Sequence, residues 1–190
     1  MSRAPNLVFS ASLPPAGALG ERVLLISDRR LGVLCPGFIR WRESFAASYP
    51  VRGGEGLKDV RAFPRHIERI VELCARTGPV SCVAAAGGGS VGDFAGFVAS
   101  VLRRGVLLVH APTTWLAALD SSHGGKTALN VAGVKNQIGT FHPAARVFLV
   151  RRLLLAQPER NVRDAGGELA KIALIDGGAW VRRMAASRRE

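Results

Sequence analysis

The sequence predicts an α/β protein with a Rossmann-like, mostly parallel sheet and flanking helices. Short apolar runs that suit buried strands alternate with longer segments of helical periodicity, which is the pattern of parallel βαβ units. The strand predicted over Val80 to Ala86 is followed by the glycine-rich segment GGGSVG and then by a helix. Glycine allows the backbone to approach a ligand closely, so this order is typical of a ligand-binding turn.

The first part of the chain supplies strands and helices in alternation. An apolar run flanked by proline suits an edge strand, a continuous apolar run suits a buried strand, and proline is well tolerated in a first helical turn. The predicted elements are strands at Leu7 to Leu13 and Arg22 to Ser27, a helix at Phe38 to Ser48, a loop at Val51 to Lys58, and a helix from Pro64 to Arg76 with Ile67, Ile70, Val71 and Leu73 facing inward.

The segment from Gly87 to Asn136 organises the rest of the chain. Its glycines precede a predicted helix, Asp93 to Arg103, whose first N–H groups favour an anion such as a pyrophosphate. The spacing GGGSVG differs from the usual GxGxxG fingerprint, so a simple tight turn remains an alternative. A second strand, Val106 to Ala111, leads into Thr113 and Thr114, at the sheet edge where open α/β proteins bind ligands.

Polar residues crowd the end of this segment, which makes it a poor core and a good pocket wall. They are Asp120, Ser121, Ser122, Gly124, Gly125, Lys126, Asn130, Lys135 and Asn136. Asp28, at the tip of the first buried strand, could equally hold a ribose hydroxyl or cap a helix.

The last part of the chain contains three strands or turns and a final helix. The predicted elements are a hairpin strand at Thr127 to Val131, a helical turn at Val134 to Phe141, a strand at Arg146 to Val150 and a helix at Asn161 to Asp176. Glu168 and Lys171 are three residues apart on one helical face, and spacing alone favours a surface ion pair.

Composition limits the class of protein. The 190 residues contain no apolar run near the ~20 residues that span a bilayer, and no secretory signal is evident. We therefore expect a cytoplasmic protein without membrane contact. The net charge of +12 comes from scattered arginines with few aromatic residues, so a solvated basic surface is favoured over nucleic-acid binding. The three cysteines show no metal-type spacing.

Lysine is rare in this arginine-rich chain. Only four of the 26 basic residues are lysines: Lys58, Lys126, Lys135 and Lys171. A compact ammonium can contact a single oxygen inside a pocket where a planar guanidinium often cannot. All four lysines are therefore candidate functional residues.

The motifs resemble those of the 3-dehydroquinate synthase family of sugar-phosphate cyclases. The matching segments are GGEGLK, GGGSVGDFAGF, RGVLLVHAPTT, DSSHGGKTALN, KNQIGTFH and PERNVRDAGGELAKIALI, in that order. The resemblance implies an N-terminal NAD-binding α/β domain and a largely helical C-terminal domain. It also implies NAD and a divalent metal, zinc or cobalt, as cofactors. The implied reaction closes the ring of a heptulosonate 7-phosphate with loss of phosphate, in the shikimate pathway.

The same resemblance implies a role for each matching residue. Residues near NAD would be Asp28, Glu55, Lys58, Gly88, Gly89, Ser90, Val91, Gly92, Asp93, Thr113, Thr114, Lys126 and Lys135. Residues at the substrate would be Asp120, Lys126, Lys135, Asn136 and Lys171, with Arg104 reaching its phosphate across a homodimer interface. Glu168 would be a metal ligand.

The chain also departs from the family pattern. Leu153 to Ala156 replaces a threonine-containing segment beside the adenine, Ser90 an aliphatic residue, Trp115 a leucine and Gly53 an aspartate. His66, His110, His123 and His142 do not match the family's two metal-binding histidines, and we interpret His110 as a packed strand residue.

We therefore expect residues 1–157 to form the NAD-binding domain and 158–190 to begin a truncated C-terminal domain, whose apolar face at Leu174, Ile175, Trp180 and Val181 would be under-covered. Alternatives are a non-catalytic NAD-binding homologue, half of a split enzyme that recruits a complementary C-terminal half, or a related cyclase of secondary metabolism.

Overall fold

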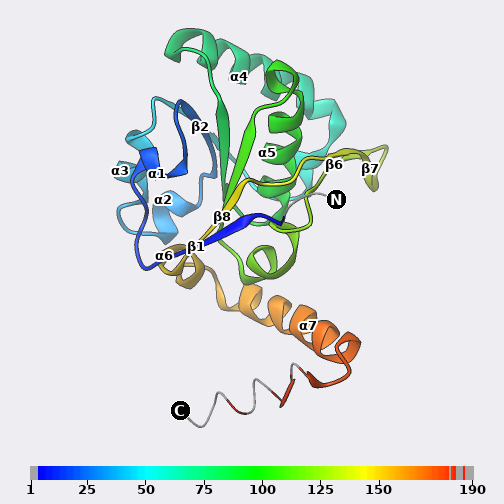
Figure 1. Cartoon of the computed structure of the whole chain (residues 1–190). Coiled ribbons are helices and arrows are strands. Elements are labelled where there is room, and N and C mark those ends of the chain that lie inside the picture. Colours follow the sequence, from blue (N-terminus) through cyan, green and yellow to red (C-terminus); the bar gives the residue numbers. More distant parts are fainter. Residues whose placement is uncertain (1–3, 180, 183–185, 187–190) are drawn as a thin grey trace.

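A six-stranded, fully parallel sheet forms the centre of the molecule (Figure 1). The computed structural model describes residues 4–179, 181, 182 and 186. The strand order is β1-β8-β5-β4-β2-β3, so the predicted edge strand β1 lies at one edge beside β8. The strands are β1 (Asn6–Ser10), β2 (Val23–Asp28), β3 (Ala47–Val51), β4 (Cys82–Gly87), β5 (Leu107–Pro112) and β8 (Arg146–Val150). This arrangement confirms the predicted Rossmann-like α/β class.

Helices cover both faces of the sheet. One face carries α4 (Phe63–Thr77) and α5 (Gly89–Val101), and the other carries α1 (Ala16–Leu19), α2 (Leu31–Leu34), α3 (Phe38–Glu43) and α6 (Arg151–Leu155) (Figure 1). Alternate residues of β2 serve the two layers: Leu24 packs with the α4–α5 face and Leu25 with the α1–α3 face. This period of two is what a strand buried on both sides requires.

Two predicted elements were wrong. The helix expected over Phe38 to Ser48 ends at Glu43, and the chain then forms β3. This edge strand tolerates Pro50 because, among the described residues, β2 is the one strand that pairs with it. The helical turn expected over Val134 to Phe141 is strand β7, which pairs antiparallel with β6 (Lys126–Val131). In α4 the predicted inward face holds at Ile70, whereas Val71 is exposed.

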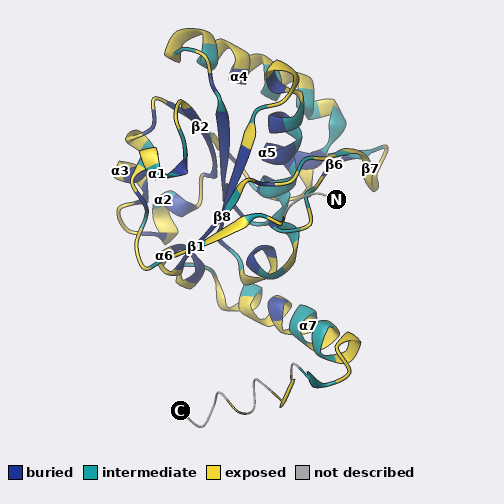
Figure 2. Cartoon of the chain, viewed as in Figure 1, coloured by how far each residue is buried: buried dark blue, intermediate teal, exposed yellow. Residues whose placement is uncertain are grey.

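The hairpin of β6 and β7 lies against α5 rather than in the main sheet. The contact is close: a Cβ at Gly96 of α5 would lie 2.6 Å from the Thr127 methyl group. β7 is exposed along nearly its whole length (Figure 2). Its strand form is therefore supported by pairing with β6 rather than by burial.

The carboxyl ends of the strands converge where the chain changes direction across the sheet. From β2 the chain moves outward to β3, and from β4 it moves the opposite way to β5 and β8. The 3₁₀ segment η1 (Glu55–Lys58) follows β3 at this edge, and α7 (Glu159–Ile175) extends below it (Figure 1). Such a switch point is the usual ligand site of an open α/β sheet.

Candidate cofactor cleft and polar network

A cleft of about 560 Å³ opens at this switch point. It is formed by the residues that follow β2, β4 and β5 together with the start of α7. Six of the predicted cofactor residues line it: Asp28, Gly88, Gly89, Ser90, Thr113 and Thr114. Their grouping follows from the topology, since parallel strands place all their carboxyl ends at one edge.

The glycine turn is shorter than the sequence indicated, because α5 already begins at Gly89. The N–H groups of Val91 and Gly92 both donate to the Gly88 carbonyl, at 3.1 and 3.0 Å. The N–H groups of Gly89 and Ser90 precede the first intrahelical bond, so they are available to an anion at the helix N-terminus. Val91 itself is fully buried in the core.

The glycines leave room for a ligand close to the protein backbone. A Cβ at Gly88 would come within 3.2 Å of the Thr114 methyl group, which would narrow the cleft. Thr113 is buried and donates its backbone N–H to the Gly87 carbonyl at 2.9 Å, while Thr114 Oγ1 accepts the Ala117 N–H at 3.2 Å. The cleft therefore fits a dinucleotide, with a glycine cradle beside two hydroxyl-bearing residues.

Asp28 neither caps a helix nor lies free at the strand tip. Its carboxylate is buried and accepts the Arg30 N–H and Nε–H, both at 3.0 Å to Oδ1, and the Arg30 Nη2–H at 2.5 Å to Oδ2. Gly53 lies against this pair, since a Cβ there would be 2.5 Å from Asp28 Oδ2. Arg30, paired with Asp28, thus occupies the space that an aspartate side chain at position 53 would need.

A second group of predicted residues forms a polar network beside the cleft. Lys58 is buried, and its Nζ donates to Asp93 Oδ2 at 2.5 Å and to Asn136 Oδ1 at 2.6 Å. Asn136 in turn donates its N–H to Asn130 Oδ1, and Asn130 donates to Glu55 Oε2 at 2.8 Å. The network joins η1, α5 and the hairpin, so Lys58 holds three elements together.

The pKa values of the two carboxylates in this network are shifted in opposite directions. Burial raises the pKa of Asp93, and the Lys58 hydrogen bond and charge oppose that rise without cancelling it. The pKa of Glu55 is lowered, chiefly by its hydrogen bond from Asn130, with contributions from Lys135 and Lys58. Glu55 and Lys135 are largely exposed, and their 3.6 Å ion pair lies at the solvent edge of the network. Lys126, on β6, is also exposed.

The cleft and the network are directly connected. Gly54 donates its N–H to Ser90 Oγ at 2.9 Å, which ties the loop before η1 to the first turn of α5. Ser90 lines the cleft, and Asp93 lies one turn further along the same helix. A ligand in the cleft would therefore contact the helix that carries the Lys58 partner.

Glu168 and Lys171 form the ion pair that their spacing suggested, at 2.5 Å, with Glu168 largely covered and Lys171 exposed. Asp120 is exposed on the π-helical turn η4 (Ala117–Ser121), and its charge acts on both Asp93 and Lys171. These residues therefore lie toward the α7 side of the network. Among the residues that the structure describes, no three His, Cys, Asp or Glu side chains gather as metal ligands.

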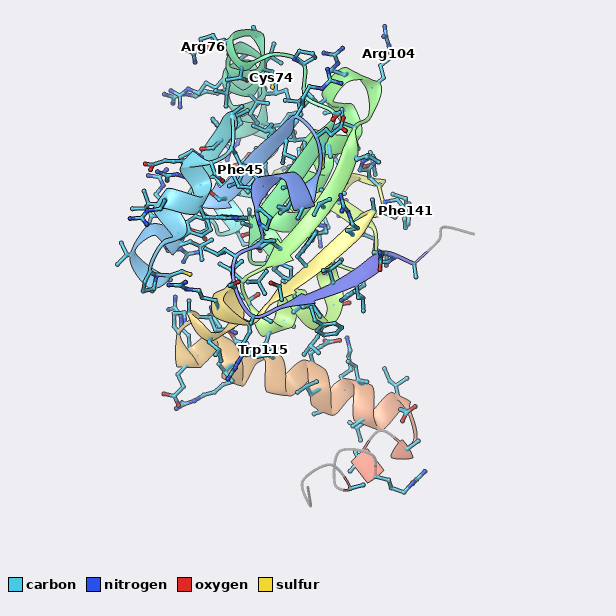
Figure 3. The ribbon with its side chains drawn as sticks, turned by 60° about the vertical axis from the view of Figure 1, so that its left-hand side comes forward. Phe45, Cys74, Arg76, Arg104, Trp115 and Phe141 are labelled. Carbon is cyan, nitrogen blue, oxygen red and sulfur yellow. The ribbon has the colours of Figure 1, made fainter. Side chains whose placement is uncertain are left out.

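Arg104 lies far from this site. It belongs to the turn between α5 and β5, at the amino ends of the strands, whereas the cleft is at their carboxyl ends. Figure 3 shows Arg104 at the opposite end of the molecule from Trp115 and α7. Arg104 cannot approach the cleft of its own chain.

The sequence reasoning missed Arg30 and Gln157, and it listed Asn130 only as one of the polar residues of the predicted pocket wall. Arg30 pairs with Asp28, Asn130 links Glu55 to Asn136, and Gln157 accepts the Trp115 N–H at 3.1 Å beside the cleft. Asn130 stood within the dense polar segment, which was its only signal. Leu153 and Leu154 are buried in the core, so from that segment only Ala156 lines the cleft.

The fold and the cleft define an α/β protein with a cleft at the switch point of a parallel sheet. Residues 48–164 match the family model described as 3-dehydroquinate synthase N-terminal, and the chain belongs to this family. It is 35% identical to the 3-dehydroquinate synthase of Leptospira interrogans over 163 residues, covering 83% of this chain and 44% of that protein. The relative from Xanthomonas axonopodis pv. citri is 34% identical over 192 residues, covering 98% and 51%.

Solved structures agree with this placement. A 2-deoxy-scyllo-inosose synthase complexed with carbaglucose-6-phosphate, NAD+ and Co2+ is 30% identical, with a TM-score of 0.74 over 89% of this chain and 48% of that one. ValA, a 2-epi-5-epi-valiolone synthase from Streptomyces hygroscopicus with NAD+ and Zn2+ bound, shares the fold at 24% identity and a TM-score of 0.70, over 87% and 48%. The chain spans about half the length of these relatives. No helix among the described residues is long and apolar enough to cross a membrane.

Proposed function

We propose that this chain forms the NAD-binding part of a 3-dehydroquinate synthase-type enzyme, which closes the ring of a heptulosonate 7-phosphate and eliminates its phosphate. The observation that carries the proposal is the cleft, which brings Asp28, the glycine turn and the two threonines together in a member of this family. When bound, NAD would supply a reversible oxidation that makes a neighbouring C–H acidic. The chain's own residues bind and orient.

Different parts of the cleft would bind different parts of NAD. The N–H groups of Gly89 and Ser90 would bind the pyrophosphate, and Thr113 and Thr114 would border the nucleotide. Arg30 holds Asp28 in place, which leaves Asp28 as a positioned but largely satisfied acceptor. Glu55 would contribute to the adenosine side from the edge of the network.

The substrate side is assigned to the network and to α7. Lys126, Lys135 and Asn136 on the hairpin, with Asp120 and Lys171, would present amines, an amide and a carboxylate to the phosphorylated sugar. Ammonium groups can stabilise oxyanions that develop during phosphate loss. Lys58 would act indirectly, by fixing Asn136 through its 2.6 Å hydrogen bond. Arg104 would serve the site of a second subunit, which is a reason to propose a homodimer.

The metal requires more ligands than these residues offer. Zinc sites take about three protein ligands, and the described residues provide Glu168, already paired with Lys171, without a group of three. We therefore propose that residues 158–190 begin a second domain, and that the remaining ligands come from such a domain or from a complementary chain. Leu174, Ile175 and Val181 are exposed and would pack against it, while Trp180 lies outside the described residues. We place the enzyme in the cytoplasm.

A phosphate-release assay tests the proposal. The purified chain with zinc, NAD and the heptulosonate phosphate should show no turnover, and a separately expressed C-terminal half of a related enzyme should restore it. Clear turnover by the 190-residue chain alone, abolished by Glu168→Ala, would contradict the assignment of the metal site.

A second candidate, a secondary-metabolism cyclase, is favoured by the likeness to 2-deoxy-scyllo-inosose synthase. The same complemented assay with a hexose phosphate distinguishes the two.

A further inference from the structure

A second cleft, of about 650 Å³, lies on the β3 side of the sheet edge. It is bounded by the residue after β2, by the end of β3 and its following loop, by η1 and by α4. Its polar lining residues are Arg29, Tyr49, Arg52, His66 and Arg69. No carboxylate is found among the described residues that line it.

The three arginines carry charge that the described residues do not neutralise. None of the six ion pairs found there includes Arg29, Arg52 or Arg69, whereas Arg30 and Arg61 are each held by an aspartate. All three come from different elements, so their convergence depends on the fold and not on a local run of basic residues. Arg29 is fixed at its backbone, which donates to the Val51 carbonyl at 2.8 Å.

An aromatic pair gives the cleft a firm and partly apolar wall. The Tyr49 hydroxyl is 2.8 Å from His66 Nδ1, and the His66 ring stacks edge to face on Phe94, with centroids 5.2 Å apart. Burial, together with the charges of Arg69 and Arg65, lowers the pKa of His66, so the imidazole is neutral at pH 7. Nδ1 lies within hydrogen-bond distance of the Tyr49 hydroxyl, and one of the two ring nitrogens of the neutral imidazole carries a proton.

We propose that this cleft binds the phosphoryl group of a phosphorylated ligand through Arg29, Arg52 and Arg69. A guanidinium matches two oxygens of a phosphoryl group at once, and three of them suit a dianion better than a single carboxylate. The volume exceeds what inorganic phosphate needs and leaves room for the rest of a small ligand. The inference does not depend on the proposed cyclase activity.

Two sources could supply the phosphoryl group. Gly53 lines this cleft and also lies against the Asp28–Arg30 pair of the cofactor cleft, so the two clefts adjoin. The group could therefore be the 2′-phosphate of an NADP-type dinucleotide whose ribose lies near Asp28. Alternatively it could belong to a separate phosphorylated metabolite.

Calorimetry with pyrophosphate at low ionic strength tests the site, using the chain without any dinucleotide. We expect binding in the millimolar range or tighter, weakened about tenfold by Arg52→Gln or Arg69→Gln. Arg65→Gln is the matched control, because Arg65 is exposed on the same helix and also influences His66 but does not line the cleft. Pyrophosphate should also raise the His66 pKa in an NMR titration.

The remaining arms identify the source. Loss of NADP affinity but not NAD affinity in Arg52→Gln would assign the group to the cofactor, whereas pyrophosphate binding that persists under saturating NADP would assign it to a separate ligand. The proposal is overturned if pyrophosphate does not bind at millimolar concentration. It is equally overturned if Arg65→Gln weakens binding as much as Arg52→Gln and Arg69→Gln, or if those two variants bind pyrophosphate unchanged.

Discussion

Replacing Lys58 by methionine should destabilise the fold and loosen the hairpin. Methionine keeps most of the side-chain volume but removes the ammonium that contacts Asp93 and Asn136. Asp93 would then be a covered carboxylate without its cation. Breaking a fully buried ion pair costs about 3–5 kcal/mol. Here the Lys58 side chain is 6% exposed and that of Asp93 21%, so solvent screens part of the loss and about 2–3 kcal/mol is expected.

The pH dependence gives this prediction its sign. Burial already raises the pKa of Asp93, and Lys58 opposes that rise, so the variant's Asp93 pKa should rise further. A carboxyl whose folded pKa exceeds its unfolded value contributes most stability below the unfolded pKa of about 3.9 and loses it as pH rises through the folded pKa. The deficit of Lys58→Met relative to the parent should therefore shrink as pH falls from 7 toward 4.

Urea unfolding at pH 7 and at pH 4.5 measures both effects. Lys135→Met is the matched control, because that lysine is 68% exposed and its partner is 3.6 Å away; it should show no measurable cost. The double variant Lys58→Met, Asp93→Leu should recover much of the loss, since no unpaired charge remains. The reasoning is refuted if Lys58→Met and Lys135→Met lose the same stability. It is also refuted if the stability loss of the double variant equals the sum of the losses of Lys58→Met and Asp93→Leu measured singly.

Two further predictions concern His110 and Gly53. Burial lowers the pKa of His110 to about 4, below its unfolded value of about 6.5, so stability should fall by up to about 3 kcal/mol as pH drops between those values. Thermal unfolding at a series of pH values should show a smaller loss of stability toward acid pH in His110→Leu than in the parent. The same loss in both proteins would exclude His110 as the cause. Gly53→Asp should lower stability by about 1–2 kcal/mol, because its Cβ would meet the Asp28–Arg30 pair at 2.5 and 3.0 Å and its side chain would add a second carboxylate. The control is Gly56→Asp, whose Cβ would contact nothing within 4 Å, and equal melting temperatures for the two variants would contradict the account.

Much of the fold could be predicted because its strands are buried on both faces. β2, β4 and β8 are short apolar runs between turn signals, and each was found within a residue or two of its predicted place. β7 could not be predicted, because its residues are exposed and carry no alternation; its form depends on β6, a partner that periodicity does not reveal. β3 was hidden by Pro50, which a sheet edge tolerates.

The candidate site was predicted in part for a similar reason. The residues of the cleft follow strands directly, so the topology alone brings Asp28, Gly88 and Thr113 to one edge. The Lys58 network depends on long-range side-chain contacts, which spacing does not encode. Lysine rarity nevertheless marked Lys58, and the structure shows a compact ammonium between Asp93 and Asn136.

Calorimetric titration of the chain with NAD tests the central claim most directly. The cofactor should bind, weakly, in the unmodified chain, and Gly89→Val should abolish binding by blocking the approach to the first turn of α5. The fold should tolerate this variant, because a Cβ at Gly89 meets only Ser121 Oγ at 3.5 Å, and Gly17→Val, distant in α1 with nothing within 4 Å, serves as the control. No heat of binding at millimolar NAD in the unmodified chain, or unchanged affinity in a folded Gly89→Val variant, would contradict the assignment of the cleft.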